Sequence, residues 1–371
     1  MPLKKLDVNG LRNLKPLQLN LSPTLNLFYG SNGSGKTSLL EAAFLLGRGR
    51  SFRNRQFQTV INTEQSECTV FGLSAAQGGR EVPLGVTRYR QGNGVFKVAG
   101  QSVNTASSLA DALPILLINQ DGFNLLEGSP QHRRRFLDWG VFHVEHSYQQ
   151  HYQRFQRILK QRNSLLRHGR IDDNLLATWD KEFADTARLI TEARETYLQR
   201  LLPVLQEVLQ ELSPQLQLVS FSLYLGWDED KSLSDVLIAD RTRDQQFKTT
   251  HHGPHRADLR IRHERHNASD ILSRGQLKIL AVAMLIAQGY LYHEKTGKHG
   301  LYLIDDLAAE LDLEHRILVA RLLEKLGAQV FITGVEKQVL LGLWKQAIPK
   351  EMKLFHVEQG EITETPLNEP I

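Results

Sequence analysis

The chain has 371 residues, 41% of them hydrophobic and 23% charged, a composition that is ordinary for a globular protein and a length that suits two domains. A formal net charge of +4 is too small to indicate a nucleic-acid partner by itself, and the single cysteine, Cys68, excludes an intrachain disulfide framework and favours a reducing compartment. No signal-peptide pattern is present, and the longest apolar run, residues 279–287, is too short to cross a bilayer, so we expect a cytoplasmic protein with no membrane association.

Predicted strands dominate the N-terminal part of the chain. Residues 17–21 alternate between apolar and polar side chains, and residues 25–29 form a short apolar run that ends at Gly30, as a buried strand entering a loop would. A helix is expected over residues 36–46. Polar and glycine-rich turns then separate several β-rich segments between residues 66 and 118.

The middle of the chain is predicted to be mainly helical, over residues 131–212. Apolar side chains recur three or four positions apart from Trp179 to Leu212, and Pro203 is expected to kink or break this helix. Residues 213–227 alternate like a strand, and residues 228–250 are charged and expected at the surface.

Alternating strands and helices return after Gly253. Residues 300–306 and 328–334 are β-rich, and a helical pattern over residues 313–326 separates them. This order is typical of a mostly parallel sheet, so the pattern predicts an α/β fold.

One domain is expected to interrupt the other. Residues 1–128 and 251–371 are predicted to form the α/β domain, and residues 129–250 a mainly helical arm inserted into it. No internal repeat and no low-complexity segment is found.

A phosphate-binding loop follows the first buried strand. Its sequence, GSNGSGKT, matches G-x-x-x-x-G-K-[ST] between a predicted strand and a predicted helix. The glycines let backbone N–H groups converge on phosphate oxygens, and the helix N-terminus adds its positive dipole. Lys36 is expected to reach the β- and γ-phosphates of ATP, and Thr37 to ligate Mg²⁺. The predicted ATP-binding residues are Gly30, Ser31, Asn32, Gly33, Ser34, Gly35, Lys36 and Thr37.

Two acids end the predicted strand LYLIDD. In a phosphate-loop sheet the carboxylate at the end of such a strand holds Mg²⁺, usually through water. We assign this role to Asp305 and expect Asp306 to orient or deprotonate an attacking water as the general base. The alternative, that the two acids only mark a strand end and a turn, is weakened by the intact phosphate loop.

A second anion-binding pattern, LSRGQ, starts at Leu272 and opens an apolar helix. It resembles the LSGGQ signature of ABC-type ATPases, a family in which the signature of one subunit caps the γ-phosphate held by the phosphate loop of another. The resemblance implies a head-to-tail homodimer around two ATP molecules, in which Ser273, Gly275 and Gln276 contact the partner's nucleotide. The alternative is a serine that only caps the helix.

Other ABC-type motifs are matched less closely. AAELD resembles the D-loop, which implies a contact in trans by Asp312, and Gln120, after the strand at residues 116–118, is the candidate Q-loop residue at the Mg²⁺. Asp306 stands where that family has glutamate, and Thr333 where it has a switch histidine. Both differences favour slow hydrolysis, in which ATP acts mainly as a clamp.

Longer motifs run through most of the chain. They are GLRNL around Arg12, GRSFR at residues 49–53, EGSPQHRRRFLDWG at residues 127–140, HGPHRADL at residues 252–259, and then LSRGQLKIL, LIDDLAAELD and VFITG. Together they resemble the RecF family of bacterial DNA replication and repair proteins, an ABC-type branch related to the SMC group. That family shares the aspartate pair and the missing switch histidine.

The resemblance implies a DNA-binding ATPase that dimerises on ATP and hydrolyses it weakly, with stimulation by DNA. It implies a role in recombinational repair of gapped DNA and stalled replication, with recombinase loading and a link to the SOS response. The implied partners are single-stranded or gapped DNA, bound without sequence specificity, and RecR, with RecO in the same pathway. A nucleoid-associated place in the cytoplasm follows from these partners.

Two acid-free clusters of basic residues support binding to DNA phosphates. In the arm cluster, Tyr148, Tyr152 and Phe155 are interleaved with the basic residues; the alternative there is a solvated basic helix face over an aromatic core. For the cluster after the phosphate-loop helix, contacts with the nucleotide or with a second subunit are as well supported as contacts with DNA. The DNA candidates are Arg48, Arg50, Arg53, Arg55, Arg154, Arg157, Lys160, Arg162, Arg167 and Arg170.

Three histidines in HHGPHR, at residues 251–256, have the spacing of metal ligands, but only Asp258 lies near as a further ligand and Pro254 makes the segment a loop. A zinc site is therefore not favoured. The segment matches the GPHR motif of the RecF family, and the resemblance implies a contact near the nucleotide or between domains. Two other functions stay open. They are the ATPase subunit of a membrane transporter, and a structural DNA clamp in which hydrolysis is incidental.

Overall fold

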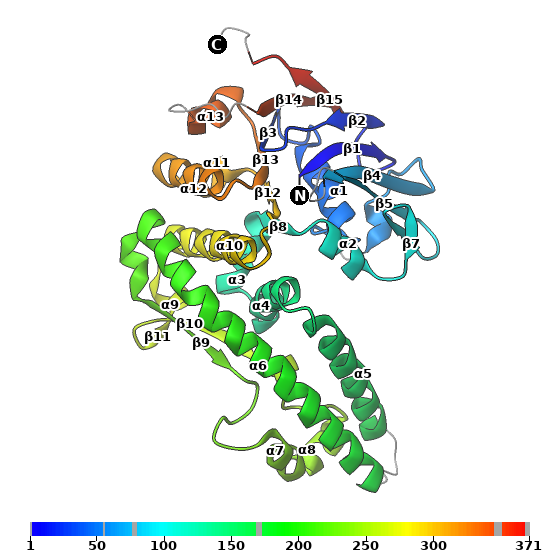
Figure 1. The fold of residues 1–371 in the computed structure, drawn as a ribbon, viewed down its shortest axis with the longest axis vertical. Coiled ribbons are helices and arrows are strands. Elements are labelled where there is room, and N and C mark those ends of the chain that lie inside the picture. The colour runs from blue at the N-terminus through cyan, green and yellow to red at the C-terminus, as the bar shows by residue number, and fades with distance from the viewer. Residues whose placement is uncertain (1, 55, 76–79, 168–172, 345–350, 368–371) are drawn as a thin grey trace. The chain divides into compact units, whose positions relative to one another are not determined.

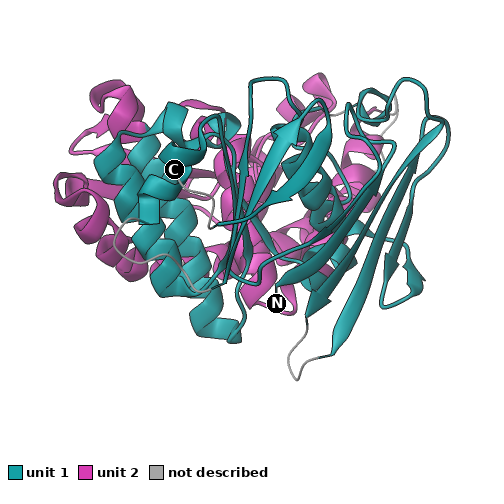
Figure 2. Ribbon diagram, turned by 90° about the horizontal axis from the view of Figure 1, so that it is seen from above, with its two compact units in different colours: residues 1–122, 278–371 teal, residues 123–277 magenta. Residues whose placement is uncertain are grey.

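The computed structural model describes residues 2–54, 56–75, 80–167, 173–344 and 351–367. The chain forms two compact units, which Figure 2 colours separately. Unit 1 comprises Met1–Gly122 and Lys278–Ile371, and unit 2 comprises Phe123–Leu277.

Unit 2 extends further along the chain than the predicted arm, residues 129–250. Strand β10 (Asp258–His263) pairs antiparallel along its whole length with β9 (Val219–Tyr224), so the chain beyond residue 250 stays with unit 2 until Leu277. The LSRGQ turn therefore lies in unit 2, and not in the α/β unit as the sequence led us to expect.

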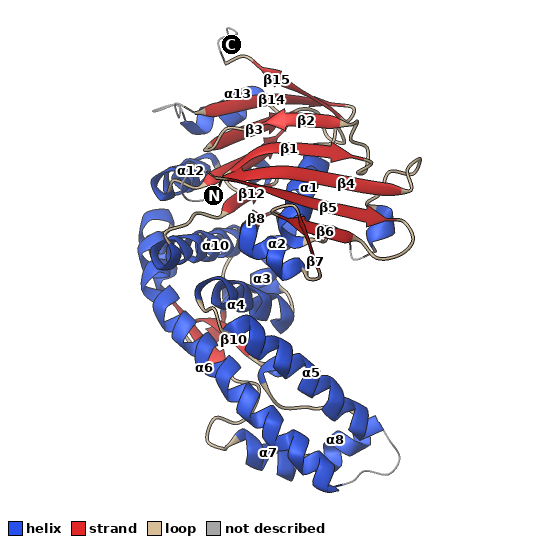
Figure 3. Cartoon of the chain, turned by 45° about the vertical axis from the view of Figure 1, so that its right-hand side comes forward, coloured by secondary structure: helices blue, strands red, loops and turns tan. Residues whose placement is uncertain are grey.

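The first sheet in the described part of unit 1 has six strands and is antiparallel throughout, in the order β2-β1-β4-β5-β6-β7 (Figure 3). Along β4, buried and more exposed side chains alternate, as expected for a sheet with one face on the core. Its strands are β1 (Leu3–Asn9), β2 (Leu17–Asn20), β4 (Glu67–Ala75), β5 (Glu81–Tyr89), β6 (Val95–Val98) and β7 (Gln101–Val103).

The second sheet of unit 1 is parallel except for its edge strand β15, in the order β15-β14-β3-β13-β12-β8. β12 and β13 are buried along their whole length, which is typical of parallel strands covered on both faces. The predicted mostly parallel sheet is confirmed. Its strands are β3 (Leu25–Tyr29), β8 (Ile115–Ile118), β12 (Leu301–Ile304), β13 (Gln329–Gly334), β14 (Met352–Glu358) and β15 (Glu361–Thr365).

Helix α1 (Lys36–Arg48) is buried on nearly all its faces. One apolar cluster joins its Leu40 to Val70 of the first sheet and Phe331 of the second. The helix that follows the phosphate loop is therefore fixed in the core of unit 1. The other helices of this unit are α2 (Ala106–Ala112), α11 (Leu307–Glu310), α12 (Leu313–Leu326) and α13 (Lys337–Leu341), and α10 (Arg274–Thr296) continues into it from unit 2.

Unit 2 is mainly helical and carries a small sheet in the order β11-β10-β9, with β11 at His266–Asn267 (Figure 1). α6 continues through Pro203, so the predicted break in this helix is wrong. The proline is exposed. Its helices are α3 (Asn124–Glu127), α4 (Pro130–Val144), α5 (Tyr148–Arg167), α6 (Asp173–Leu212), α7 (Leu233–Ala239), α8 (Arg241–Phe247) and α9 (Ala268–Ile271).

Among the helices that the structure describes, none combines the length and the apolar character that a membrane span requires.

Candidate functional site

The phosphate loop joins β3 to α1 in the core of unit 1. Gly35 is the residue before the helix and has φ 119°, a conformation that side chains other than glycine rarely adopt. The side-chain Nδ2 of Asn13 donates to the Gly33 carbonyl oxygen at 3.3 Å, and its Oδ1 accepts from the Ser38 hydroxyl at 3.1 Å. A side chain from the segment after β1 thus holds the loop against the start of α1.

Lys36 is folded back over this loop. Its Nζ donates to the carbonyl oxygens of Gly30 at 2.7 Å and Ser31 at 2.8 Å, and the residue is only 8% exposed. Burial lowers the pKa of Lys36, and the nearby charges of Asp306 and Asp305 oppose this effect. The Ser34 Oγ is buried without a hydrogen-bond partner among the described residues. A loop with buried donors of this kind suits an anionic ligand.

Asp305 lies directly after β12 and receives two hydroxyl donors. Thr37 Oγ1 donates to Asp305 Oδ1 at 3.1 Å, and Thr333 Oγ1 donates to the same oxygen at 2.7 Å. The three residues come from the first turn of α1, which follows β3, and from the ends of two strands, β12 and β13, so they meet at the carboxyl edge of the parallel sheet. This edge is where open α/β sheets bind their ligands.

Asp306 has a strained backbone, with φ 49° and ψ 53° in the left-handed region. Its amide donates to Thr333 Oγ1 at 2.9 Å. Burial raises the pKa of Asp306, and the charge of Asp305 raises it further, while Lys36 opposes both. A carboxyl group with a raised pKa beside a second carboxylate has the properties of a general base.

Gln120 begins a short 3₁₀ turn after β8, and β8 pairs in parallel with β12 so that Ile118 lies beside Ile304. Gln120 and Asp305 therefore both follow the carboxyl ends of neighbouring strands, as the prediction required. The Gln120 side chain is exposed.

The LSRGQ turn is a reciprocal capping box at the start of α10. The Ser273 amide donates to Gln276 Oε1 at 2.9 Å, and the Gln276 amide donates to Ser273 Oγ at 3.3 Å. Ser273 and Gly275 are exposed, and a Cβ on Gly275 would meet only the Ser273 hydroxyl, at 4.0 Å. Packing within the described part of the chain does not require a glycine here, which leaves room for another molecule to approach.

Asp312 caps helix α12. Its carboxylate accepts from the His315 amide at 3.0 Å and lies 2.7 Å from the His315 imidazole, yet 63% of its side chain is exposed. The pKa of Asp312 is lowered, first by the hydrogen bond from the His315 amide. The carboxylate therefore has a structural role within the chain and still faces solvent.

Exposed large apolar side chains flank these motifs. Ile271, at 51% exposed, precedes the LSRGQ turn; Leu313, at 54%, follows Asp312; and Val335, at 44%, follows the end of β13. Single exposed apolar side chains are common on protein surfaces.

The basic residues of α5 divide into two groups. Arg154, Arg157, Lys160 and Arg167 are exposed, and Arg154 pairs with Glu182. Arg162 is completely buried, where it binds Asp180 at 2.7 Å and Asp244 at 2.6 Å. The prediction of Arg162 as a DNA contact is therefore wrong, because its charge is neutralised in the core of unit 2.

The cluster after α1 is less uniform than the sequence indicated. Arg50 and Arg53 are exposed, whereas Arg48 is half-buried, and burial together with the Arg50 charge lowers the pKa of Arg48 to about 10. The other two candidates, Arg55 and Arg170, lie outside the described residues.

The three histidines of the HHGPHR loop bind their own unit. His251 Nδ1 lies 2.7 Å from Asp244, His252 Nε2 lies 2.6 Å from Asp240, and His255 Nε2 lies 3.0 Å from the Thr250 carbonyl oxygen. Within the described ranges no group of three or more His, Cys, Asp or Glu is arranged to hold a metal.

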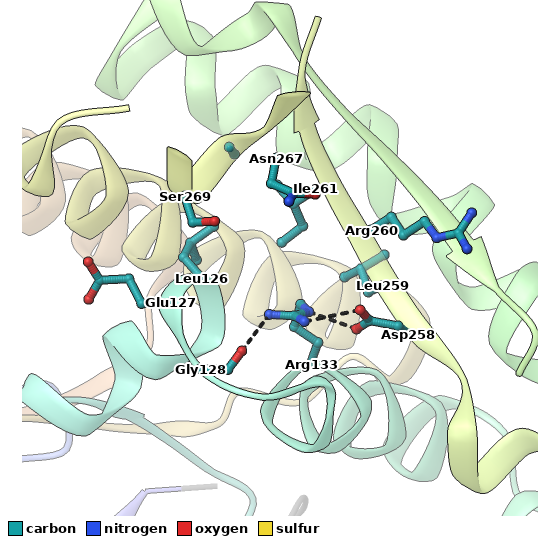
Figure 4. A pocket seen from close by; sticks show the side chains of 11 residues that line it. Leu126, Glu127, Gly128, Arg133, Asp258, Leu259, Arg260, Ile261, Asn267 and Ser269 are labelled. Carbon is teal, nitrogen blue, oxygen red and sulfur yellow. Dashed lines mark hydrogen bonds and ion pairs between the residues drawn. The ribbon is translucent and has the colours of Figure 1, made fainter. Parts of the chain in front are cut away.

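A cavity of about 240 Å³ is lined by residues of unit 2 (Figure 4). Arg133 closes its floor with a bidentate ion pair to Asp258, at 2.7 and 3.0 Å, and with a hydrogen bond to the Gly128 carbonyl oxygen at 2.9 Å. The Arg133 donors are therefore committed within unit 2.

Comparison with known proteins decides the family. The model of the RecF/RecN/SMC N terminal domain matches residues 2–363. The DNA replication and repair protein RecF of Pseudomonas syringae pv. syringae (strain B728a) is 50% identical over 366 residues, which cover 98% of this chain and 99% of the relative. The chain belongs to the RecF family. RecF of Azotobacter vinelandii (strain DJ / ATCC BAA-1303) is likewise 50% identical over 365 residues, with 98% and 99% covered.

Solved RecF structures share the whole fold. One described as the recombination mediator protein RecF with ATP in the RecFOR pathway has a TM-score of 0.85 at 25% identity, with 98% of each chain covered. A second, with ATPrS, has a TM-score of 0.83 at 26% identity and the same coverage. An Smc head bound to a domain of ScpA, with a TM-score of 0.57 at 16% identity over 99% of this chain and 98% of that one, shares the fold alone. The predicted α/β ATPase-head fold and the resemblance to RecF are confirmed.

Sequence reasoning did not find the roles of Asn13 and Thr333. Asn13 belongs to the GLRNL motif, but its contact with the phosphate loop joins segments distant in the sequence. Thr333 was noticed only as a missing histidine, and its bonds to both aspartates become visible only when β12 and β13 are paired.

Proposed function

We propose that this chain binds ATP with Mg²⁺ at the phosphate loop of unit 1 and uses it as a switch for dimerisation on DNA. The observation that carries the proposal is that Thr37, Asp305 and Lys36 meet at one sheet edge. There the Lys36 ammonium binds backbone carbonyl oxygens, and the Ser34 hydroxyl has no partner among the described residues. The solved RecF relatives described with ATP support the same ligand.

The residues present fit a magnesium ion. Thr37 Oγ1 and Asp305 Oδ1 lie 3.1 Å apart, as two oxygen donors to one small ion would, and Gln120 follows the neighbouring strand. When bound, Mg²⁺ neutralises charge that develops on the phosphate oxygens. Lys36 would exchange its two carbonyl partners for the β- and γ-phosphates, and the backbone of residues 30–35 would cradle them.

Weak hydrolysis fits the remaining geometry. Asp306 is held beside Asp305 and has a raised pKa, so it can accept a proton from water, but its carboxylate reaches one methylene less far than a glutamate. ATP would then stabilise an assembly for long periods before it is cleaved. We propose stimulation of this activity by DNA, as the family resemblance implies.

The signature turn is proposed to act in trans. Ser273, Gly275 and Gln276 would contact the nucleotide bound to the partner subunit, and Asp312 would line the same interface. The exposure of Ser273 and the open space beside Gly275 support a turn that a second copy can reach. The α10 dipole also favours a phosphate at this turn.

DNA is proposed to bind without sequence specificity, through the exposed basic face of α5 and the cluster at Arg50 and Arg53. The preferred DNA is single-stranded or gapped. The proposed role is recombinational repair of gapped DNA and of stalled replication, by loading of the recombinase and with a link to the SOS response. RecR is the proposed direct partner, with RecO in the same pathway, and the cytoplasmic nucleoid the proposed location. We take unit 1 as the ATPase head and unit 2 as the arm.

The testing experiment compares binding to gapped, single-stranded and double-stranded DNA without nucleotide, with ATP and with a non-hydrolysable analogue. The switch predicts binding that either nucleotide strengthens and that hydrolysis releases. Equal affinity in all three nucleotide states would instead favour a structural clamp in which hydrolysis is incidental.

A further inference from the structure

The small sheet of unit 2 has one basic, polar face. Along β10, Arg260 and Arg262 are exposed, while the residues that alternate with them are buried. The register places Ser222 opposite Arg260 and Ser220 opposite Arg262, so these four exposed side chains share a face. We call them the basic sheet face.

The positive charge of this face is not neutralised by its own unit. Asp258 lies on the same face of β10, but its carboxylate is engaged by Arg133, and Figure 4 shows the Arg260 side chain directed away from that pair. Arg260 and Arg262 form no ion pair with any residue that the structure describes. The Arg260 guanidinium lies 4.4 Å from the centroid of the Tyr224 ring, which orients the charge without cancelling it.

We propose that the basic sheet face binds the phosphate backbone of nucleic acid and extends the DNA contact of the proposed function, on which this inference rests. Arginine side chains and serine hydroxyls are common donors to phosphate. A strand rise of about 3.4 Å per residue separates Arg260 from Arg262 by about 7 Å, so the two can meet different phosphates. The guanidinium stacked on an aromatic ring favours nucleic acid over an acidic protein, because bases also stack on such groups.

The test measures the affinity of the full chain for a gapped oligonucleotide by fluorescence anisotropy at several salt concentrations. The double variant R260A/R262A should bind about tenfold more weakly, and the slope of log affinity against log salt should fall by about 0.9 for each duplex phosphate that the variant no longer neutralises. The matched control is R188A/R200A, which removes two exposed charges from α6. Affinity and slope equal to those of the control would overturn the inference and leave the face to an acidic protein. No DNA binding by the wild-type chain would overturn the proposed function instead.

A second inference concerns Thr333, which is completely buried and bonds to both acids of the site. Its hydroxyl donates to Asp305 Oδ1 at 2.7 Å and accepts from the Asp306 amide at 2.9 Å. The first bond turns the carboxylate of Asp305 toward Thr37, and the second holds the left-handed backbone of Asp306.

We infer that Thr333 is a positioning residue that sets both acids for the proposed ATPase, on which this inference also rests. One hydroxyl donates to a carboxylate and accepts from a strained amide, and a side chain without a hydroxyl, such as valine, can do neither. Serine keeps the hydroxyl, and valine keeps the shape without it.

The test measures turnover and, separately, the affinity for a non-hydrolysable ATP analogue with Mg²⁺ and with EDTA. T333V should lower kcat about tenfold or more and lose most of the gain in analogue affinity that Mg²⁺ provides, with the affinity in EDTA unchanged. T333S should restore both values. If T333V does not fold, T333C, whose thiol is a weak donor, replaces it. Equal impairment of T333S and T333V, or none in T333V, would overturn the inference, whereas a wild-type chain that binds no ATP would overturn the proposed function.

Discussion

Two buried polar clusters of this chain differ in the partners of their positively charged side chain. In unit 2, Arg162 binds Asp180, Asp244 and the Thr250 hydroxyl, all from the same unit. In unit 1, the Lys36 ammonium binds only two backbone carbonyl oxygens, and the Ser34 hydroxyl has no partner among the described residues.

The difference separates a structural cluster from a ligand site. A buried ammonium whose hydrogen bonds all go to neutral carbonyl oxygens suits an anionic ligand, whereas the charge of Arg162 is already neutralised by two carboxylates, although its Nη2 lacks a hydrogen-bond partner among the described residues. Buried arginines that face carboxylates on neighbouring helices instead fix the helices of the arm. Breaking each cluster should therefore affect a different property of the protein.

The largest expected effect on stability comes from Arg162→Ala. The change leaves the carboxylates of Asp180 and Asp244 buried with fewer partners, so the free energy of unfolding should fall by about 3–5 kcal/mol. Urea unfolding measures it, and Arg157→Ala on the exposed side of the same helix should change stability by less than about 0.5 kcal/mol. Similar values for the two variants would contradict a structural role for Arg162.

Lys36→Ala should lower the affinity for ATP and leave the stability of the protein almost unchanged. ATP affinity, measured by calorimetry, should fall about a hundredfold or more because the ammonium that reaches the phosphates is lost, and Lys36→Arg should also abolish binding. The stability of the ligand-free protein should stay close to that of the wild type, because only two backbone carbonyls lose a donor. A variant that binds ATP normally would show that the loop is not the nucleotide site.

The same two clusters also show which parts of the site and of the fold could be predicted from the sequence. The phosphate loop and the aspartate pair lie directly after buried strands, as expected, because each motif is contiguous in the sequence. Arg162 was misplaced because the basic stretch was read as one group, although it falls on the α5 face of Phe155, Ile158 and Leu166. The end of unit 2 at Leu277 depends on pairing between β9 and β10, which no local pattern specifies.

A smaller effect is expected from pH acting on His255. Burial lowers the pKa of His255 from 6.5 to about 4, so the unfolded chain binds the proton more readily than the folded one. This contribution to stability is present above pH 6.5 and is lost as the pH falls toward 4, by about 2 kcal/mol between pH 7 and pH 5. Unfolding at both values should show that His255→Asn loses less stability than the wild type over this interval; an equal loss would contradict the assignment.

The smallest expected effect comes from the exposed basic residues of α5, which we expect to bind DNA, in contrast to the buried Arg162. The triple variant R154A/R157A/K160A should weaken DNA binding about tenfold and reduce the salt slope by about 2 to 3, because exposed cations contact phosphates. Its stability should remain near the wild-type value, in contrast to Arg162→Ala. Unchanged DNA affinity and salt slope would exclude this face of α5 from the interface.

The central claim is that two copies of the chain complete each other's nucleotide site. The most direct measurement is the mass in solution, by light scattering, with ATP and with ADP, for the wild type, for Ser273→Arg and for a control, Ser234→Arg, at an exposed serine of α7. We expect ATP alone to double the mass of the wild type and the control, and Ser273→Arg to bind ATP and remain a monomer. A Ser273→Arg variant that dimerises with ATP as the wild type does would contradict the account.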